Sequence, residues 1–166
     1  MYPLKKSTLS FPDRAPIKVR VDVKVKATPR QVWDVLMDQP GWVEWYHGMV
    51  SCDVTSPPEK NGRVGFTRKV SVSGMVAEEE FIALVPEKIW AFSVFEMNSP
   101  LGTKWVERIV LEPETDGSTR IVWEAGIEPR LLGKLFKSLV VKSMEDAWRN
   151  SLQGIDAYLE QKNKSS

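Results

Sequence analysis

The sequence predicts an α+β domain in which helices cover one face of an antiparallel sheet. Three observations carry this prediction. Residues 17–26 alternate strictly between apolar and polar side chains, as a half-buried strand does. Between residues 50 and 128, further strand-like segments are separated by short turn signals. Beyond Pro129 the apolar period changes from about 2 to about 3.6, which predicts one terminal helix of about 30 residues.

The first strand is followed at once by signals for two short helices. Thr28 is a suitable N-cap, Pro29 suits the first helical position and Gln31 completes a capping box. We therefore predict a helix from Thr28 to about residue 38. A proline and a glycine end it, and the segment 41–49 is predicted to be a second short helix or a tight turn.

Strands are then predicted at 50–56 and 63–72, and hairpin turns at 73–74, 86–87, 99–100 and 116–117. Because a hairpin turn fixes the register, the turns also predict which residues face each other across the strands. One face of the sheet should then carry most of the aromatic residues. The expected partners are Val72 with Met75, Val70 with Ala77, Arg68 with Glu79, Phe66 with Phe81, Ala83 with Trp90, Phe81 with Phe92, Glu79 with Val94, Val94 with Trp105, Phe92 with Glu107 and Trp90 with Ile109, while Ile121 and Trp123 join the same face.

The composition is that of one soluble globular domain. The chain has 166 residues, of which 42% are hydrophobic and 27% charged. Its net charge of +1 gives no reason to expect a nucleic-acid partner. Because three prolines interrupt it, we expect the segment 1–16 to be flexible. Residues 17–161 should form the domain, and residues 162–166 should fray.

The chain has one cysteine, Cys52, and one histidine, His47. A single cysteine excludes an internal disulfide framework and fits a reducing compartment, so we expect a cytoplasmic protein. A single histidine excludes the usual His-rich metal sites, and the sequence has no dinucleotide or phosphate-loop motif. We therefore expect no metal and no cofactor, and either a monomer or a homodimer.

Seven Trp and six Phe are more large aromatic residues than an ordinary core of this size needs. With three charged residues on the same inward positions, they predict an aromatic-walled cavity for a small, mostly apolar ligand. The residues expected to hold this ligand are Trp42, Trp45, Phe66, Phe81, Trp90, Phe92, Trp105, Trp123, Phe136, Met144 and Trp148.

The candidate catalytic residues are the three inward charges, Arg68, Glu79 and Glu107, together with Tyr46 and His47. The charges have three readings: they reach water at the cavity rim, they form a structural buried pair, or they bind or transfer a proton. Glu107 has no cationic partner in the predicted register, and a buried unpaired carboxyl has the raised pKa that a general acid needs. His47 is either a surface residue or a base at the cavity mouth.

Three sequence blocks precede the terminal helix in a characteristic order: VDVKVKATPRQVWDVLMD (21–38), GWVEWYHGMV (41–50) and LEPETDGSTRIVWE (111–124). They resemble the opening strand and helix, the Trp-x-x-Trp turn and the last hairpin of the START/Bet v 1-like helix-grip superfamily, or SRPBCC proteins. The resemblance covers about residues 17–160. It implies a curved antiparallel sheet that grips the long C-terminal helix, with a ligand cavity between them.

Members of this superfamily include lipid and sterol carriers, hormone receptors, ubiquinone-binding proteins and aromatic polyketide cyclases. In the aromatic cyclases, a Trp, a Tyr and an Arg are proposed to hold and fold the polyketide. Trp42 matches the Trp position and Tyr46 lies near the Tyr position. Ala83 falls where the Arg stands, so that Arg is missing from this chain.

Two function classes follow. In the first, the protein is a cofactor-independent cyclase, isomerase or dehydratase that acts on a polyketide- or terpenoid-like substrate. In the second, it is a non-catalytic carrier or sensor of a lipid, isoprenoid or quinone. An adaptor that uses the fold only for interactions is a weaker third idea. The three inward charges favour the enzyme.

The start of the terminal helix carries basic residues beside leucines. Arg130, Lys134 and Lys137 share one helical face next to Leu132 and Leu135. A basic amphipathic helix can bind a membrane surface. Because the apolar stripe is needed to cover the sheet, we expect a solvated face; a surface that contacts a membrane or a partner is the alternative.

Overall fold

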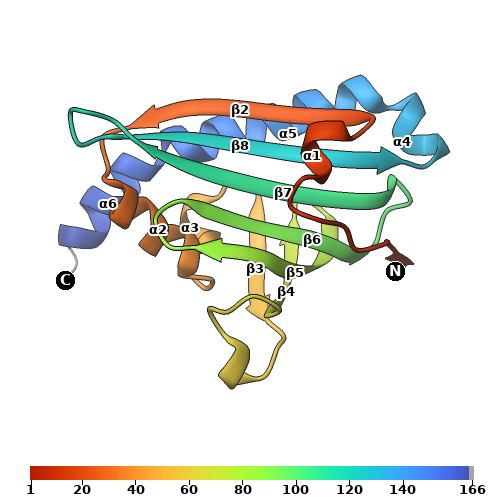
Figure 1. Cartoon of the computed structure of the whole chain (residues 1–166), viewed down its shortest axis with the longest axis horizontal. Helices are drawn as coiled ribbons and strands as arrows, with labels where there is room; N and C mark the ends of the chain where they lie inside the picture. Colours follow the sequence, from red (N-terminus) through yellow and green to blue (C-terminus); the bar gives the residue numbers. More distant parts are fainter. Residues whose placement is uncertain (165–166) are drawn as a thin grey trace.

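The computed structural model describes residues 1–164 and shows an open eight-stranded antiparallel sheet with helices along one face (Figure 1). The main strand order is β2-β8-β7-β6-β5-β4-β3, and β1 pairs with β6. The predicted α+β helix-grip fold is confirmed. The elements are β1 (Tyr2–Pro3), α1 (Phe11–Arg14), β2 (Ile17–Val25), α2 (Pro29–Met37), α3 (Trp42–Trp45), β3 (Met49–Val54), a 3-10 turn η1 (Pro58–Lys60), β4 (Thr67–Val72), β5 (Met75–Val85), β6 (Ile89–Met97), β7 (Gly102–Pro113), β8 (Thr119–Pro129), α4 (Leu131–Leu135), α5 (Lys137–Gln153) and α6 (Ile155–Lys164).

Local signals in the sequence explain where the elements begin. Thr28 caps α2 through a complete capping box, with the Gln31 backbone N–H donating to the Thr28 hydroxyl at 3.3 Å. The Gln31 side chain accepts from the Thr28 backbone N–H at 2.9 Å. In β2, every residue on the inward phase is buried and every residue on the outward phase is exposed, because one face of this strand meets the core.

The hairpin turns set the predicted register with one exception. Arg68 pairs with Glu79 across β4 and β5, and Phe92 pairs with Glu107 across β6 and β7. The exception is the end of β5, where an irregularity between Phe81 and Ala83 shifts the pairing. Ala83 therefore faces Ala91, and its predicted pairing with Trp90 is wrong, because a bulge moves every later residue by one position.

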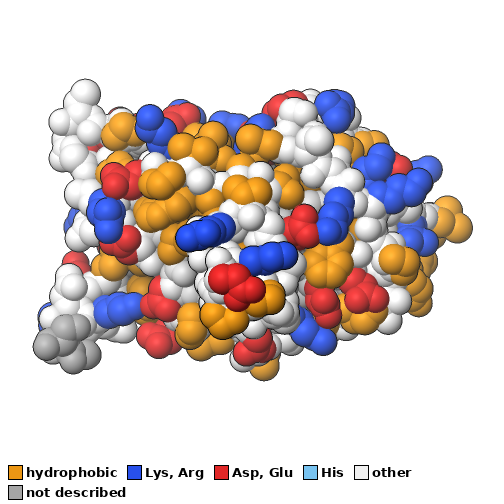
Figure 2. Space-filling view, turned by 60° about the horizontal axis from the view of Figure 1, so that its bottom comes forward, with side chains coloured by type: hydrophobic (Ala, Val, Ile, Leu, Met, Phe, Trp, Pro, Cys, Tyr) orange, Lys and Arg blue, Asp and Glu red, His pale blue; other side chains and the backbone are white. Residues whose placement is uncertain are grey.

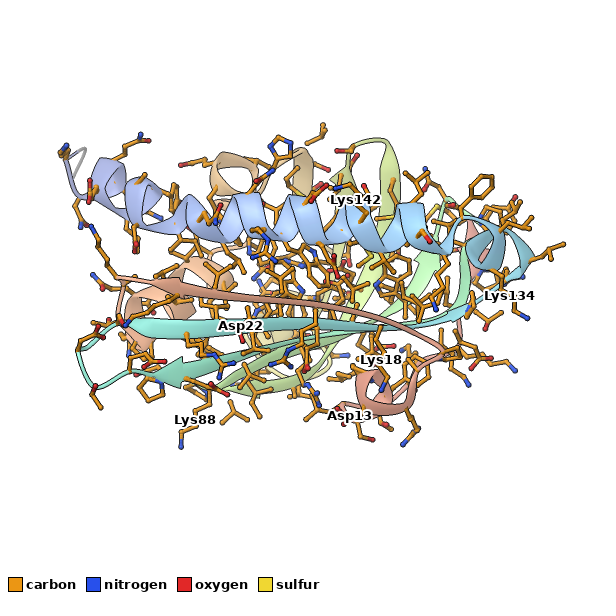
Figure 3. All side chains as sticks on the ribbon, turned by 90° about the horizontal axis from the view of Figure 1, so that it is seen from above. Asp13, Lys18, Asp22, Lys88, Lys134 and Lys142 are labelled. Atoms are coloured by element: carbon orange, nitrogen blue, oxygen red, sulfur yellow. The ribbon has the colours of Figure 1, made fainter. Side chains whose placement is uncertain are left out.

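The terminal helix is bent and interrupted. Phe136 separates α4 from α5 with a non-helical φ of −101° and ψ of 18°, and Gly154 separates α5 from α6. The later part buries its apolar stripe against the sheet, including Trp148 and Leu152. The earlier part does not, so the predicted packing of its leucines on the sheet is wrong. In Figure 3 the helix lies along one side of the sheet, and α1 lies on the other.

The N-terminal segment differs from the flexible tail that we expected. β1 pairs with β6, and α1 packs on the outer face of β7 and β8. Phe11 of α1 is buried there against Val106, and a side chain at Gly126 would lie 2.7 Å from the Pro12 Cα atom. Two isolated apolar contacts give no periodic signal, which is why the sequence pattern missed this segment.

The C-terminal end was expected to fray from residue 162. In the described chain α6 runs to Lys164, and the Lys162 ammonium donates to an Asp38 carboxylate oxygen at 2.7 Å. Residues 165 and 166 lie outside the described residues. No helix within residues 1–164 is both long enough and apolar enough to span a membrane.

Candidate functional site

Three charged side chains meet inside the molecule. Arg68 of β4, Glu79 of β5 and Glu107 of β7 all lie on the inner face of the sheet, as their predicted register required. Their exposed fractions are only 1%, 5% and 8%. One hypothesis from the sequence was that these charges reach water at the cavity rim. The structure differs from it, because the helices and the aromatic residues cover all three.

Arg68 is held on every side. Its Nε donates to a Glu79 carboxylate oxygen at 2.6 Å, and its Nη1 donates to the Gln39 side-chain oxygen at 2.8 Å. The guanidinium carbon lies 4.3 Å from the Trp42 ring centroid and 4.9 Å from that of Trp90. Aromatic faces stabilise a cation that has lost its water, so this environment stabilises the buried ion pair.

Glu107 has neutral partners instead. The indole N–H of Trp105 donates to one of its carboxyl oxygens and that of Trp123 donates to the other, each at 2.9 Å. Burial, reinforced by the negative charge of Glu79, raises the pKa of Glu107 to about 8, although the indole donors favour the carboxylate. At neutral pH the carboxyl group is therefore mostly protonated, and its O–H is a hydrogen-bond donor.

Tyr46 follows α3 and stands beside the same cluster. Its ring centroid lies 5.8 Å from that of Trp123 and 5.6 Å from that of Trp42. Burial, together with the negative charge of Glu107, raises the pKa of the Tyr46 phenol far above its ordinary value. Tyr46 is therefore neutral throughout the physiological range and can donate a hydrogen bond.

These groups surround a small cavity of about 60 Å³, which we call the inner chamber. A water molecule needs roughly 10–15 Å³ of such space, so the chamber holds only a few water-sized groups. Four methionines form part of its wall, and methionine side chains adapt readily to a new neighbour. The lining residues are Trp42, Tyr46, Met49, Arg68, Val70, Val72, Met75, Ala77, Glu79, Phe92, Val94, Met97, Trp105, Glu107, Trp123, Met144 and Trp148.

A second cavity of about 260 Å³ lies between α5 and the sheet, and we call it the vestibule. It borders the inner chamber, because Tyr46, Val72, Met75, Trp105 and Met144 line both. The wall is completed by Ser73, Leu101, Leu139, Val140, Ser143 and Ala147. A ligand longer than the chamber would therefore extend past this shared border into the vestibule.

The structure divides the residues predicted to hold the ligand into three groups. Trp42, Phe92, Trp105, Trp123, Met144 and Trp148 line the inner chamber. Trp45, Phe66, Phe81 and Trp90 are buried but line neither the inner chamber nor the vestibule; Phe66 and Phe81 stack on each other, and Trp90 stacks on Trp42. Phe136 is 51% exposed, on the surface between α4 and α5.

The five predicted catalytic residues also divide. Arg68, Glu79, Glu107 and Tyr46 come together at the inner chamber. His47 is exposed and lines neither the chamber nor the vestibule, while its backbone N–H donates to the Ser151 hydroxyl at 2.8 Å. The reading of His47 as a surface residue therefore fits its position.

The sequence pattern missed residues that line the chamber or hold its side chains in place. Met75 shares the inward phase of Glu79 on β5, so the same alternation would have found it. Gln39 had no such signal, because it lies in the break after α2. Its side-chain N–H group donates to the backbone oxygens of Leu36 and Met37, which aims its oxygen at Arg68.

Known proteins resemble this chain in sequence and in fold. Residues 16–160 match the model of a family described as polyketide cyclase/dehydrase and lipid transport. An uncharacterized protein of Mycobacterium tuberculosis is 34% identical over 126 residues, which cover 74% of this chain and 72% of that protein. An uncharacterized protein of Mycobacterium bovis matches with the same values.

Solved structures show the same fold at low identity. A hypothetical protein of Helicobacter pylori has a TM-score of 0.74 and 16% identity, over 95% of this chain and 96% of that one. A START superfamily protein of Mycobacterium smegmatis has a TM-score of 0.60 and 15% identity, over 82% of this chain and 98% of that one. Likeness at this level concerns the fold alone.

Proposed function

This chain belongs to the polyketide cyclase/dehydrase and lipid transport family, and from this premise we propose that it binds an apolar small molecule and transfers a proton to or from it. The single observation that carries the proposal is the position of Glu107. A carboxyl group that is mostly protonated at neutral pH stands at a chamber whose other walls are largely aromatic and apolar. A raised carboxyl pKa near the working pH is what efficient acid–base catalysis requires.

The two indole donors orient this carboxyl group. The indole N–H groups of Trp105 and Trp123 each donate to one carboxyl oxygen of Glu107, and the two hydrogen bonds together limit rotation of the carboxyl plane. A protonated Glu107 can donate to a ligand oxygen, and the resulting carboxylate can accept a proton from a ligand carbon. Such an exchange needs no cofactor and describes isomerisation, dehydration or the closing of a ring.

The size of the chamber indicates the shape of the ligand. Because the chamber holds only a few water-sized groups, it fits the reactive end of a molecule, such as a carbonyl or hydroxyl group. The rest of the ligand would lie in the vestibule, whose wall is mainly apolar. A polyketide- or terpenoid-like molecule with one oxygen function has this form.

A generic proton-transfer probe tests the proposal before the natural substrate is known. Butyrophenone, an aryl alkyl ketone, is incubated with the protein in D₂O, and deuterium uptake beside the carbonyl group is followed by NMR. The wild type should accelerate this uptake over buffer, and Glu107→Gln should remove at least nine-tenths of the acceleration. Glu59→Gln, at an exposed glutamate, is the matched control. Equal uptake by wild type and Glu107→Gln overturns the proposed role of Glu107.

A carrier of a lipid, isoprenoid or quinone is the second candidate function. The observation that favours it is that Leu139, an exposed leucine of α5, lines the vestibule and follows the exposed leucines of α4 along the chain. A carrier keeps its ligand, so native mass spectrometry of the purified protein should find one bound lipid or quinone per chain. The carrier is favoured if this molecule binds without being chemically changed. It is also favoured if Glu107→Gln leaves the deuterium uptake of butyrophenone unchanged.

A further inference from the structure

We propose that α4 and the first turn of α5 dock on an anionic lipid bilayer. Five large apolar side chains are exposed on this short segment, with exposed fractions from 42% to 72%. Soluble proteins seldom expose so many neighbouring large apolar side chains unless the surface binds a partner. We call this set the apolar ridge; its members are Leu131, Leu132, Leu135, Phe136 and Leu139.

The ridge is fixed in place by the chain behind it. A side chain at Gly133 would lie 2.1 Å from the Leu101 backbone oxygen, so α4 contacts the β6–β7 connection directly. The Arg130 backbone N–H donates to that same oxygen at 2.9 Å, and its Nε donates to the Gly102 oxygen at 3.0 Å. Since these contacts use the inner side of α4, its leucines face outward as part of the fold.

Positive charge accompanies the ridge. Lys134 and Lys137 are exposed, and neither forms an ion pair with a residue in the described part of the chain. Figure 3 shows Lys134 at the α4 end of the molecule. At that end, hydrophobic side chains stand beside Lys and Arg side chains on the surface (Figure 2). The first acidic residues that follow along the helix are Glu145 and Asp146, beyond the ridge.

This pairing of charge and apolar surface fits an anionic bilayer better than a second copy of the chain. Leucine and phenylalanine side chains enter the boundary between head groups and acyl chains, while lysines contact the anionic head groups. Two copies joined ridge to ridge would place their lysines against each other, and like charges disfavour that contact.

Docking would also place the vestibule at the membrane. Leu139 belongs to the ridge and also lines the vestibule. Leu101, which lies behind α4, lines the vestibule as well. An apolar molecule could pass from the lipid into the vestibule beside Leu139 without crossing open water. The inference goes beyond the proposed function, because it holds whether the ligand is converted or only carried.

Vesicle flotation tests the proposal. The full chain is mixed at low salt with vesicles of phosphatidylglycerol and phosphatidylcholine in equal parts, or of phosphatidylcholine alone. Binding should require the anionic lipid and weaken with added salt. Leu131→Ser/Leu135→Ser/Phe136→Ser should lower the affinity at least tenfold. Lys134→Glu/Lys137→Glu should lower it at least 25-fold, since each lysine near an anionic surface contributes about fivefold.

The controls carry the same chemistry elsewhere on the surface. Val43→Ser/Val50→Ser changes two exposed valines, and Lys60→Glu/Lys88→Glu reverses two exposed lysines, all outside the ridge. Both should bind as the wild type does. Absence of wild-type binding, or equal losses in the control variants, overturns the proposal. So does light scattering that shows a dimer which the ridge substitutions dissociate.

The vesicle result is independent of the proton-transfer result. Glu107→Gln alters only the interior, so it should float with anionic vesicles as the wild type does. The ridge variants should keep the exchange of butyrophenone protons. Circular dichroism melting of each variant shows that it is folded, so a lost signal is assigned to the surface and not to unfolding.

Discussion

Glu79 and Glu107 lie on the same face of the sheet and are almost equally hidden from water, yet their surroundings differ in kind. Glu79 contacts a guanidinium at 2.6 Å, whereas Glu107 contacts two neutral indoles at 2.9 Å. Burial raises the pKa of both carboxyl groups, but only Glu79 has a cation that opposes this rise at short range. The comparison teaches that the partner, more than the depth, decides whether a buried carboxyl holds a fixed charge or exchanges a proton.

Removing the Arg68 guanidinium should have the largest effect on the stability of the fold. Arg68→Met leaves Glu79 buried without its partner, and we expect the free energy of unfolding at pH 7 to fall by about 3–5 kcal/mol. Urea unfolding measures this loss. Lys24→Met, which breaks an exposed pair with Asp116, is the control and should leave the free energy of unfolding close to that of the wild type. Arg68→Met/Glu79→Leu should recover part of the stability; a loss below that of the control contradicts the fixed-charge reading.

The proton on Glu107 should appear in the pH dependence of stability. Its pKa is about 8 in the folded chain against an ordinary 4.5, so the folded state binds the proton more tightly. Its contribution is complete below pH 4.5 and is lost as the pH rises through about 8, at no more than about 1.4 kcal/mol per pH unit. Urea unfolding from pH 4 to 9 should show this slope in wild type and in Glu59→Gln. The same slope in Glu107→Gln would assign it to another group.

Removing one indole donor sharpens the comparison further. Trp123→Phe deletes a hydrogen bond that favours the carboxylate, so we expect the pKa of Glu107 to rise further, by up to about one unit. NMR titration of the carboxyl carbon measures it. Trp45→Phe is the matched control, because the buried Trp45 N–H has no hydrogen-bond partner among the described residues. An equal shift in both variants would mean that the hydrogen bond itself is not responsible.

The smallest effect is expected at His47. Because its side chain is exposed and lines neither cavity, His47→Gln should change the free energy of unfolding by less than about 0.5 kcal/mol. It should also leave the deuterium uptake of butyrophenone unchanged. A loss of uptake larger than twofold would instead place His47 in the reaction.

The sequence pattern predicted the register of the inner charges well, because alternation and turn positions fix which residues share a face. It predicted Arg68 beside Glu79 and Glu107 without a cation, and both features are present. It could not locate the bulge after Phe81, because residues 81–85 are all apolar and offer no alternation whose phase a bulge would shift.

The alternation of apolar residues also could not predict which aromatic residues form the core and which form the cavity wall. Alternation shows that Trp90 and Trp123 both point inward, but only the packing of neighbouring rings shows that Trp123 borders the cavity and Trp90 does not. The apolar ridge was misplaced for a related reason. A periodic stripe shows which side of a helix is apolar, while the bend at Phe136 decides where the sheet stops covering it.

The pairing of β2 with β8 has a consequence for synthesis of the chain. Ile17 faces Ile127 and Val25 faces Thr119, so the first long strand to leave the ribosome needs the last strand as its neighbour. Until about residue 129 has emerged, the buried valines of β2 have no sheet to join. Contacts so distant along the chain slow folding, and a nascent chain of this protein should depend on chaperones for most of its synthesis.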